Sequence, residues 1–297
     1  MGLWYQRLGD YKKGFTYVSV DFKKDNAIPI TDVKIIEYIK SLKIPPAYSN
    51  VVINSNRNTK VLAYGYDSKN RKQVIYHPSF IKRQAEKKFQ RILRLEEMMP
   101  VFLKRIKRDL RFYDNDSKEK GLAVIITLII NCGFRVGNEK YAKENKSYGL
   151  TTLECHHIIP SKDNSNSTLK IKFIGKKKVE NCSDTNDKYV IEYLKKQIKG
   201  KKKTARVFKN ISSSDVNEYI KTINPEITSK DLRTWNANRL FLSFIQSPEV
   251  LKSKNPIKSA IEMVAHELHN TPAVCKSSYL HPDMITYTEE LVKKEQK

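Results

Sequence analysis

The chain has 297 residues, of which 56 are Lys or Arg and 32 are Asp or Glu, giving a net charge of +24. An excess of this size favours a polyanionic partner, with nucleic acid and anionic membrane as the two standard candidates. Hydrophobic residues make up 39% of the chain and aromatic residues 10%, which supports a folded core and argues against disorder.

Several classes of protein are excluded by features that the chain lacks. Its longest apolar run, Leu122–Ile130, is far shorter than the ~20 residues needed to span a bilayer, and it predicts a buried helix. The first residues contain no apolar core of a secretory signal, and the four cysteines lie far apart without a C-x-x-C pair. We therefore expect an intracellular protein that is not secreted, does not bind a membrane and has no metal site.

Residues 1–78 are predicted to form a small β-rich domain. A short helix is expected from about Thr31 to the prolines at positions 45 and 46, and the pair His77-Pro78 is a plausible end of the domain. The segment between the last two strands has the composition of a hairpin turn. The predicted strands are Thr16–Val20, Val51–Ile53, Val61–Tyr66 and Lys72–Tyr76.

Residues 79–297 are predicted to form a larger and mainly helical domain, so that the whole chain belongs to the α+β class. Thr168–Phe173 alternates apolar and polar residues, which predicts a strand, and Gly175–Val179 is expected to turn the chain back. Ile81–Ile92 has the pattern of a basic amphipathic helix. Further helices are predicted near residues 96–113, 117–133, 138–145, 186–198, 213–222, 231–246 and 256–268.

Four residues of the second domain together suggest one chemistry. These residues are Arg135, Lys176, Arg233 and Tyr279. Taken singly, each could be an ordinary surface or ion-pairing residue with no part in chemistry. As a set, they supply what phosphodiester transfer needs without a metal or another cofactor. Guanidinium groups can bind the non-bridging oxygens, a tyrosine hydroxyl can attack phosphorus, and an ammonium can protonate the departing hydroxyl.

The segments around these residues are distinctive and follow one another in a fixed order. In the first domain they are Ile44–Val51 (IPPAYSNV) and Asp67–His77 (DSKNRKQVIYH). In the second they are Cys132–Gly137 (CGFRVG), Tyr148–Leu153 (YGLTTL), Phe173–Lys176 (FIGK), Lys230–Thr234 (KDLRT) and Asn270–Pro282 (NTPAVCKSSYLHP). In content and order these segments resemble the motifs of the small type IB DNA topoisomerases of poxviruses, other large DNA viruses and bacteria. The resemblance covers most of the chain.

The resemblance implies a role for each motif residue. Tyr279 would be the nucleophile that forms a 3′-phosphotyrosine, and Arg135 and Arg233 would bind the scissile phosphate. Lys176 would be the general acid for the 5′-hydroxyl, with Lys230 assisting that step.

Asn270 stands where poxvirus members carry a histidine, so the resemblance implies that it donates a hydrogen bond to a non-bridging oxygen. It lies nine residues before Tyr279, whereas the neighbouring His269 lies ten before it and is expected to be a helix-end residue. Tyr287 is the rival nucleophile, but it lacks the preceding motif.

The first domain is expected to bind double-stranded DNA, and the two domains are expected to form a clamp around the duplex. Asn70 replaces a glycine of the family's hairpin, and we expect the turn to survive because asparagine tolerates left-handed backbone. Val74 and Lys177 also depart from the family pattern and leave the preferred cleavage sequence open. The residues expected to contact the major groove are Arg71, Gln73 and Tyr76, and those expected to contact phosphates are Lys69, Lys72, Lys82 and Arg83.

The leading hypothesis is an ATP-independent type IB topoisomerase that relaxes viral or cellular DNA as a monomer. One alternative is a tyrosine recombinase, which shares the chemistry but usually has histidine three residues before the second arginine, where this chain has Lys230. The other alternative is a non-catalytic DNA-binding protein on the same fold, against which the intact set of catalytic residues argues.

Overall fold

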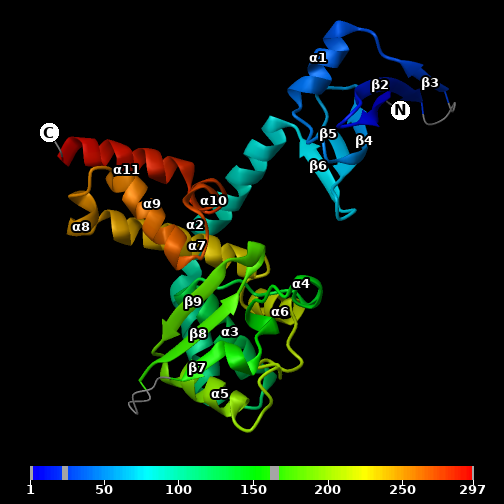
Figure 1. Cartoon of the computed structure of the whole chain (residues 1–297). Helices are drawn as coiled ribbons and strands as arrows, with labels where there is room; N and C mark the ends of the chain where they lie inside the picture. Colours follow the sequence, from blue (N-terminus) through cyan, green and yellow to red (C-terminus); the bar gives the residue numbers. More distant parts are fainter. Residues whose placement is uncertain (1–2, 22–25, 161–166, 296–297) are drawn as a thin grey trace. The chain divides into compact units, whose positions relative to one another are not determined.

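The computed structural model describes residues 3–21, 26–160 and 167–295 (Figure 1). The chain divides into two compact units, Met1–Lys87 and Lys88–Lys297. The first is built on an antiparallel sheet and the second is mostly helical, as the α+β prediction required. The expected boundary near residue 78 falls where a long helix, α2 (Pro78–Phe112), begins, and the division between units lies inside this helix.

The first unit contains a six-stranded antiparallel sheet with the strand order β3-β2-β1-β4-β5-β6. Helix α1 (Val33–Ser41) begins at Asp32, whose carboxylate accepts a hydrogen bond from the backbone N of Lys34 at 2.8 Å. Its buried residue Ile39 packs with Val51 and Ile53 of the sheet. The strands are β1 (Trp4–Asp10), β2 (Gly14–Asp21), β3 (Asn26–Pro29), β4 (Ser49–Asn54), β5 (Val61–Tyr66) and β6 (Lys72–Tyr76), of which β1 and β3 were not predicted.

The hairpin of β5 and β6 forms with the predicted strand bounds, and Tyr66 pairs with Lys72. Asn70 in the turn adopts a φ of 54°. The expectation that asparagine would accept the left-handed conformation of the family's glycine is therefore confirmed.

Helix α2 corrects one prediction, because the two helices expected at 81–92 and 96–113 are a single helix. From Phe89 to Ile106 its buried residues lie three or four positions apart without interruption at Pro100, so this part of the helix has a continuous apolar face. These buried residues are Phe89, Ile92, Leu95, Met99, Phe102, Ile106, Asp109 and Leu110.

The main core of the second unit surrounds α3 (Lys118–Cys132), in which nearly every residue is buried, as predicted for Leu122–Ile130. A three-stranded antiparallel sheet with the order β7-β8-β9 lies beside this helix (Figure 1). The other elements of this region are α4 (Glu139–Asn145), η1 (Leu150–Thr152), η2 (Cys155–His157), β7 (Ile158–Pro160), β8 (Leu169–Ile174), η3 (Lys176–Lys178), β9 (Glu180–Thr185), α5 (Lys188–Ile198) and α6 (Ser213–Ile223).

Helix α7 (Ser229–Ile245) belongs to two hydrophobic cores of the second unit. Leu232 and Trp235 near its start pack in the core around α3, whereas Ala237 and Phe241 pack in a second core. This second core is completed by α8 (Pro248–Leu251), α9 (Pro256–Glu267), α10 (Pro272–Ser278) and α11 (Pro282–Glu295), of which only α9 was predicted.

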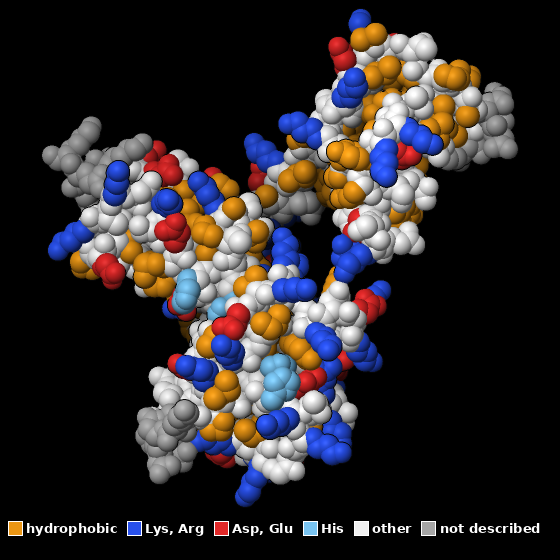
Figure 2. Space-filling model, viewed as in Figure 1, with side chains coloured by type: hydrophobic (Ala, Val, Ile, Leu, Met, Phe, Trp, Pro, Cys, Tyr) orange, Lys and Arg blue, Asp and Glu red, His pale blue; other side chains and the backbone are white. Residues whose placement is uncertain are grey.

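Lysine and arginine side chains are scattered over the visible face of each unit rather than gathered at one point (Figure 2). None of the helices in the described part of the chain is long and apolar enough to cross a membrane.

Candidate active site

The first arginine of the site is positioned by the end of helix α3. Gly133 ends the helix with a φ of +61°, and a Cβ atom there would lie 2.5 Å from the backbone oxygen of Glu267. Glycine is therefore required both by the backbone conformation and by the close approach of the segment that follows α9. Phe134 then packs into the core with 0% exposure, and Arg135 emerges from it half-buried.

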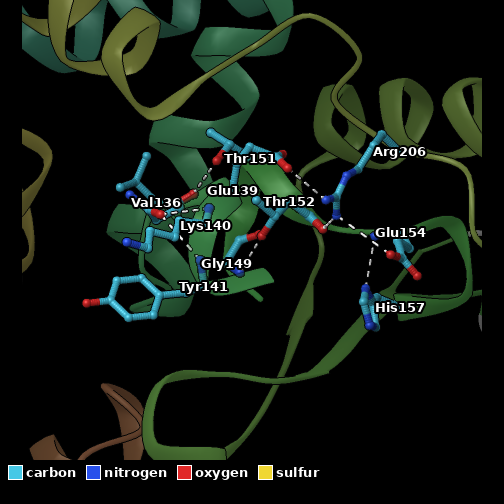
Figure 3. Close-up of polar contacts among 11 residues, drawn as sticks. Val136, Glu139, Lys140, Tyr141, Gly149, Thr151, Thr152, Glu154, His157 and Arg206 are labelled. Atoms are coloured by element: carbon cyan, nitrogen blue, oxygen red, sulfur yellow. Dashed lines mark hydrogen bonds and ion pairs between the residues drawn. The ribbon is translucent and has the colours of Figure 1, made fainter. Parts of the chain in front are cut away.

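A second loop holds the segment that contains Arg135. The backbone N of Leu150 donates to the carbonyl of Arg135 at 3.0 Å, and the backbone N of Thr151 donates to the carbonyl of Val136 at 2.8 Å. The Thr151 hydroxyl also donates to the carbonyl of Val136 at 3.0 Å (Figure 3). The YGLTTL motif is therefore a structural brace for the arginine loop.

Arg206 anchors the other side of this brace, and sequence reasoning did not identify it. Its guanidinium donates to the carbonyl of Thr152 and forms ion pairs with Glu139 at 3.1 Å and with Glu154 at 3.7 Å (Figure 3). Its partners lie more than 50 positions away in sequence, so no local pattern could have revealed them.

The second arginine, Arg233, is a buried cation. It lies in the first turns of α7 with 3% exposure, and its Nη2 donates to the carbonyl of Leu268 at 3.1 Å. Its Nε and Nη1 atoms are buried and have no hydrogen-bond partner, and no carboxylate in the described residues forms an ion pair with it. Burial lowers the pKa of Arg233 to about 10, so the side chain stays charged at neutral pH.

Asn270 lies against the first arginine. Nη2 of Arg135 donates to Oδ1 of Asn270, which orients the amide, and Nδ2 of Asn270 is buried without a partner. Three buried donors, Nε and Nη1 of Arg233 and Nδ2 of Asn270, therefore lack acceptors. Buried donors are almost always satisfied in folded proteins, so this set indicates a site for an anionic ligand.

His269 faces away from these donors. Its φ is 50°, its Nε2 donates to the carbonyl of Cys132 at 3.2 Å, and its ring stacks on Phe134 with centroids 5.2 Å apart. Burial lowers the pKa of His269 to about 4, so the ring is neutral at pH 7. The structure thus places Asn270, and not His269, against Arg135, and His269 follows the end of α9 as expected.

Tyr279 ends helix α10 and is 8% exposed. The guanidinium carbon of Arg233 lies 5.4 Å from the centroid of its ring. Burial alone would raise the pKa of Tyr279, but the positive charges of Arg233, Arg135 and Lys230 outweigh burial and lower it. The rival Tyr287 lies on α11 and is 62% exposed.

The two lysines of the predicted site are placed differently. Lys230 is exposed in the first turn of α7, where its charge acts on Tyr279. Lys176 is exposed at the turn between β8 and β9, and among the described residues no contact joins its side chain to Tyr279. The backbone N of Tyr148 donates to the carbonyl of Ile174 at 2.8 Å, which ties this hairpin to the loop that braces Arg135.

Asn238 fixes the backbone that immediately follows the Tyr279 side chain, and sequence reasoning missed it. Its Nδ2 donates to the carbonyl of Tyr279 at 2.9 Å, and its Oδ1 accepts from the backbone N of His281 at 2.9 Å. Because Asn238 lies on α7, the same helix orients Arg233 and the segment that contains Tyr279. The sequence does show an asparagine five residues after Arg233, but it does not show that this side chain bonds the backbone next to Tyr279.

In the first unit, Asp67 organises the hairpin expected to contact DNA. Its carboxylate accepts from Nε of Arg71 at 2.8 Å and from Nε2 of Gln73 at 3.0 Å, and the hydrogen bonds from Arg71 lower the pKa of Asp67 to about 2. Tyr76 lies on the opposite face of β6 from Gln73, because successive side chains of a strand alternate. The structure therefore brings Arg71 and Gln73 together and separates them from Tyr76.

The cations expected to contact phosphates are distributed over the hairpin and α2. Nζ of Lys72 lies 4.0 Å from the centroid of the Tyr64 ring. Lys69 is exposed in the turn, and Lys82 and Arg83 are exposed in the first turns of α2.

Fold and site together define a class: a two-unit protein with an antiparallel sheet and a helical unit, in which buried arginine and asparagine donors lie beside a tyrosine and form a site for an anionic ligand. Residues 77–297 match the family described as eukaryotic DNA topoisomerase I, catalytic core, and residues 14–67 match the bacterial DNA topoisomerase IB, N-terminal domain. The chain belongs to the type IB DNA topoisomerase family, whose members are isomerases.

The chain is similar to several viral proteins over most of their length. The chain is 31% identical to DNA topoisomerase 1B of Acanthamoeba polyphaga mimivirus, with 94% of this chain and 85% of the relative covered. It is 29% identical to DNA topoisomerase I of monkeypox virus and to DNA topoisomerase 1B of vaccinia virus, with 95% of this chain and 89% of each relative covered. These relatives are named as topoisomerases and not as recombinases.

Proposed function

We propose that the protein relaxes supercoiled duplex DNA by cutting one strand transiently, without ATP or a metal ion. The observation that carries this proposal is the buried, unpaired Arg233 beside Tyr279, together with the unsatisfied amide of Asn270. A phosphodiester bound between these residues would supply the missing acceptors and the missing negative charge. Its phosphorus would then lie next to the tyrosine hydroxyl.

In the proposed reaction, the oxygen of Tyr279 attacks phosphorus, and the bond from phosphorus to the 5′-oxygen breaks. Arg135, Arg233 and Asn270 hold the non-bridging oxygens, where negative charge increases in the transition state. The surrounding positive charge that lowers the pKa of Tyr279 favours loss of its proton. The product is a 3′-phosphotyrosine and a free 5′-hydroxyl.

Lys176 is proposed as the acid that protonates the departing 5′-oxygen, and Lys230 as a second cation near the phosphate. The exposed turn η3 leaves Lys176 accessible to a bound strand. Religation is the reverse of cleavage, with the 5′-hydroxyl attacking the phosphotyrosine. One phosphate ester replaces another in both steps, so no nucleotide hydrolysis is needed to drive the cycle.

The hairpin of the first unit and the start of α2 are proposed to bind the duplex. Arg71 and Gln73, which share one side of the hairpin, would contact bases, and Lys69, Lys72, Lys82 and Arg83 would contact phosphates. We propose that the protein acts as a monomer on viral or cellular DNA inside the cell. Binding through several phosphates predicts a steep loss of affinity with salt.

The test is relaxation of a supercoiled plasmid by dilute protein in EDTA without ATP. Tyr279→Phe is expected to abolish both relaxation and the covalent DNA adduct while leaving DNA binding intact, and Tyr287→Phe is the matched control that should retain both. Absence of relaxation by the unmodified protein would overturn the proposal. An adduct that persists in Tyr279→Phe and disappears in Tyr287→Phe would move the nucleophile to α11.

A further inference from the structure

The carbonyl that immediately precedes Tyr279 is held by a residue of another helix. Ser278 is the last residue of α10, and the final carbonyls of a helix have no partner within it. Nζ of Lys88, on α2, donates to the carbonyl of Ser278 at 3.2 Å. A lysine at this position satisfies the helix end and also complements its partial negative charge.

The next residue of α2 holds the other side of the tyrosine. Phe89 is 5% exposed, and its ring lies against the ring of His281 with centroids 4.3 Å apart. Consecutive residues of α2 therefore contact Ser278 and His281, which flank Tyr279 and Leu280. With Asn238 bonded to the same segment from α7, the nucleophile's backbone is held from two helices.

One turn later, α2 also fixes the helix that carries Arg233. Nη2 of Arg91 forms an ion pair with Oδ1 of Asp231 at 3.0 Å. The other oxygen of Asp231 accepts from the backbone N and the hydroxyl of Thr228, which caps the start of α7. Residues 88–91 of α2 thus touch both segments that must meet at the phosphate.

The surroundings of Lys88 are those of a residue held in place. Nζ lies 3.9 Å from the centroid of the Phe89 ring, and the side chain is half-buried. Burial lowers its pKa, as does the neighbouring charge of Lys230, whereas Asp231 and Tyr279 raise it. Lys88 therefore lies within electrostatic range of the proposed nucleophile and of the cation next to it.

We propose that Lys88 is a positioning residue for Tyr279, which sets the angle at which the hydroxyl approaches phosphorus by fixing the Ser278 carbonyl. This inference rests on the proposed role of Tyr279 as the nucleophile. A displacement of about 1 Å at a reacting group can lower a rate by ~100-fold. Loss of Lys88 should therefore reduce the cleavage step itself rather than the affinity for DNA.

The chain provides a matched control one residue earlier. Lys87 is exposed on the same helix, and Lys87→Met removes the same charge without removing the contact to Ser278. The experiment measures the single-turnover rate of adduct formation on a short DNA duplex at saturating protein. The dissociation constant for the duplex is measured in proteins that also carry Tyr279→Phe, so that no adduct forms during binding. Lys88→Met is expected to lower the rate by ~10- to 100-fold with little change in affinity.

Two further variants separate positioning from charge. Lys88→Arg, which keeps a donor and a positive charge, should restore most of the rate, whereas Lys87→Met should cleave at nearly the unmodified rate. Phe89→Leu should slow cleavage without changing the net charge. The melting temperature of each variant verifies that it is folded.

Two outcomes would overturn the inference. One is a Lys88→Met protein that cleaves at the unmodified rate once the DNA is saturated, and the other is a loss equal to that of Lys87→Met. Failure of the proposed function is distinguishable, because the unmodified protein would then form no adduct through Tyr279 at all.

Discussion

Replacing Arg233 by methionine is expected to stabilise the free protein and to abolish DNA cleavage. Arg233 is buried, carries a charge without an ionic partner and leaves two of its donors unsatisfied. Removing a buried, uncompensated charge is favourable for folding when an apolar side chain can occupy the space. The same change removes the group proposed to bind the scissile phosphate.

The magnitude follows from the pKa of the guanidinium. Burial lowers it from 12.5 to about 10, so the unfolded chain holds the proton more tightly than the folded protein does. At about 1.4 kcal/mol per pKa unit, keeping the charge buried costs about 3 kcal/mol at every pH below the folded pKa. Methionine also loses the hydrogen bond to Leu268, worth about 1 kcal/mol, which leaves a gain of about 2 kcal/mol.

The assay is urea and thermal unfolding followed by circular dichroism, in parallel with adduct formation. A gain of about 2 kcal/mol corresponds to a rise of roughly 4–8 °C in Tm for a unit of this size. Cleavage should fall by ~1,000-fold or more, as for loss of an oxyanion donor. Lys252→Met, at the exposed position that follows α8, is the control and should change stability by less than about 0.5 kcal/mol.

A lower unfolding midpoint for Arg233→Met would refute the reasoning. It would mean that the positive charge of Arg233 is already stabilised in the protein without a ligand. The unsatisfied donors of Arg233 would then not indicate an anion-binding site. Retained cleavage would refute the proposed role in phosphate binding independently of stability.

Three further predictions concern the framework of the site. Gly133→Ala should lower the free energy of unfolding by about 2–3 kcal/mol, measured in urea, because alanine disfavours the left-handed backbone and its Cβ would meet the Glu267 carbonyl; an unchanged midpoint would contradict the required close approach. On acidification from about pH 7 to pH 4.5, the unmodified protein should lose about 2 kcal/mol more free energy of unfolding than His269→Asn. Burial holds the pKa of His269 near 4 in the folded protein, so the unfolded chain binds the proton first. Equal losses in the two proteins would show that the ring is protonated without penalty. Asn238→Ala should slow adduct formation by ~10- to 100-fold at saturating DNA, because the Tyr279 backbone loses its tie to α7, and cleavage at the unmodified rate would rule out that tie as a determinant of the rate.

The sequence was sufficient to predict the elements that carry strong local patterns. The β5–β6 hairpin, the buried helix α3 and the return of β8 into β9 form close to their expected positions, because alternation, an apolar run and turn residues each act over short distances. The resemblance to a family supplied what local patterns could not, namely that Arg135, Arg233, Asn270 and Tyr279 belong to one site.

The contacts that orient those residues were not predictable from the sequence. Asn238 and Lys88 donate hydrogen bonds to backbone carbonyls at the end of α10. Every residue has a backbone carbonyl, so the sequence does not show which one accepts such a bond. The short helix α10 was missed for a related reason, since its packing in the second core stabilises it more than its own composition does. Helix α2 was predicted as two helices with a gap at residues 93–95, but Leu95 in that gap is fully buried and the helix continues through it.

The division of the second unit into two hydrophobic cores has an evolutionary consequence. Arg135 and Phe134 extend from one core, whereas Asn270, His269 and Tyr279 are carried by segments packed on the other. A substitution that repacks either core would shift half of the site relative to the other half. Such a change should persist only when a compensating change arises in the other core. Substitutions in the two cores should therefore be correlated among relatives, most strongly around the stacked rings of Phe134 and His269.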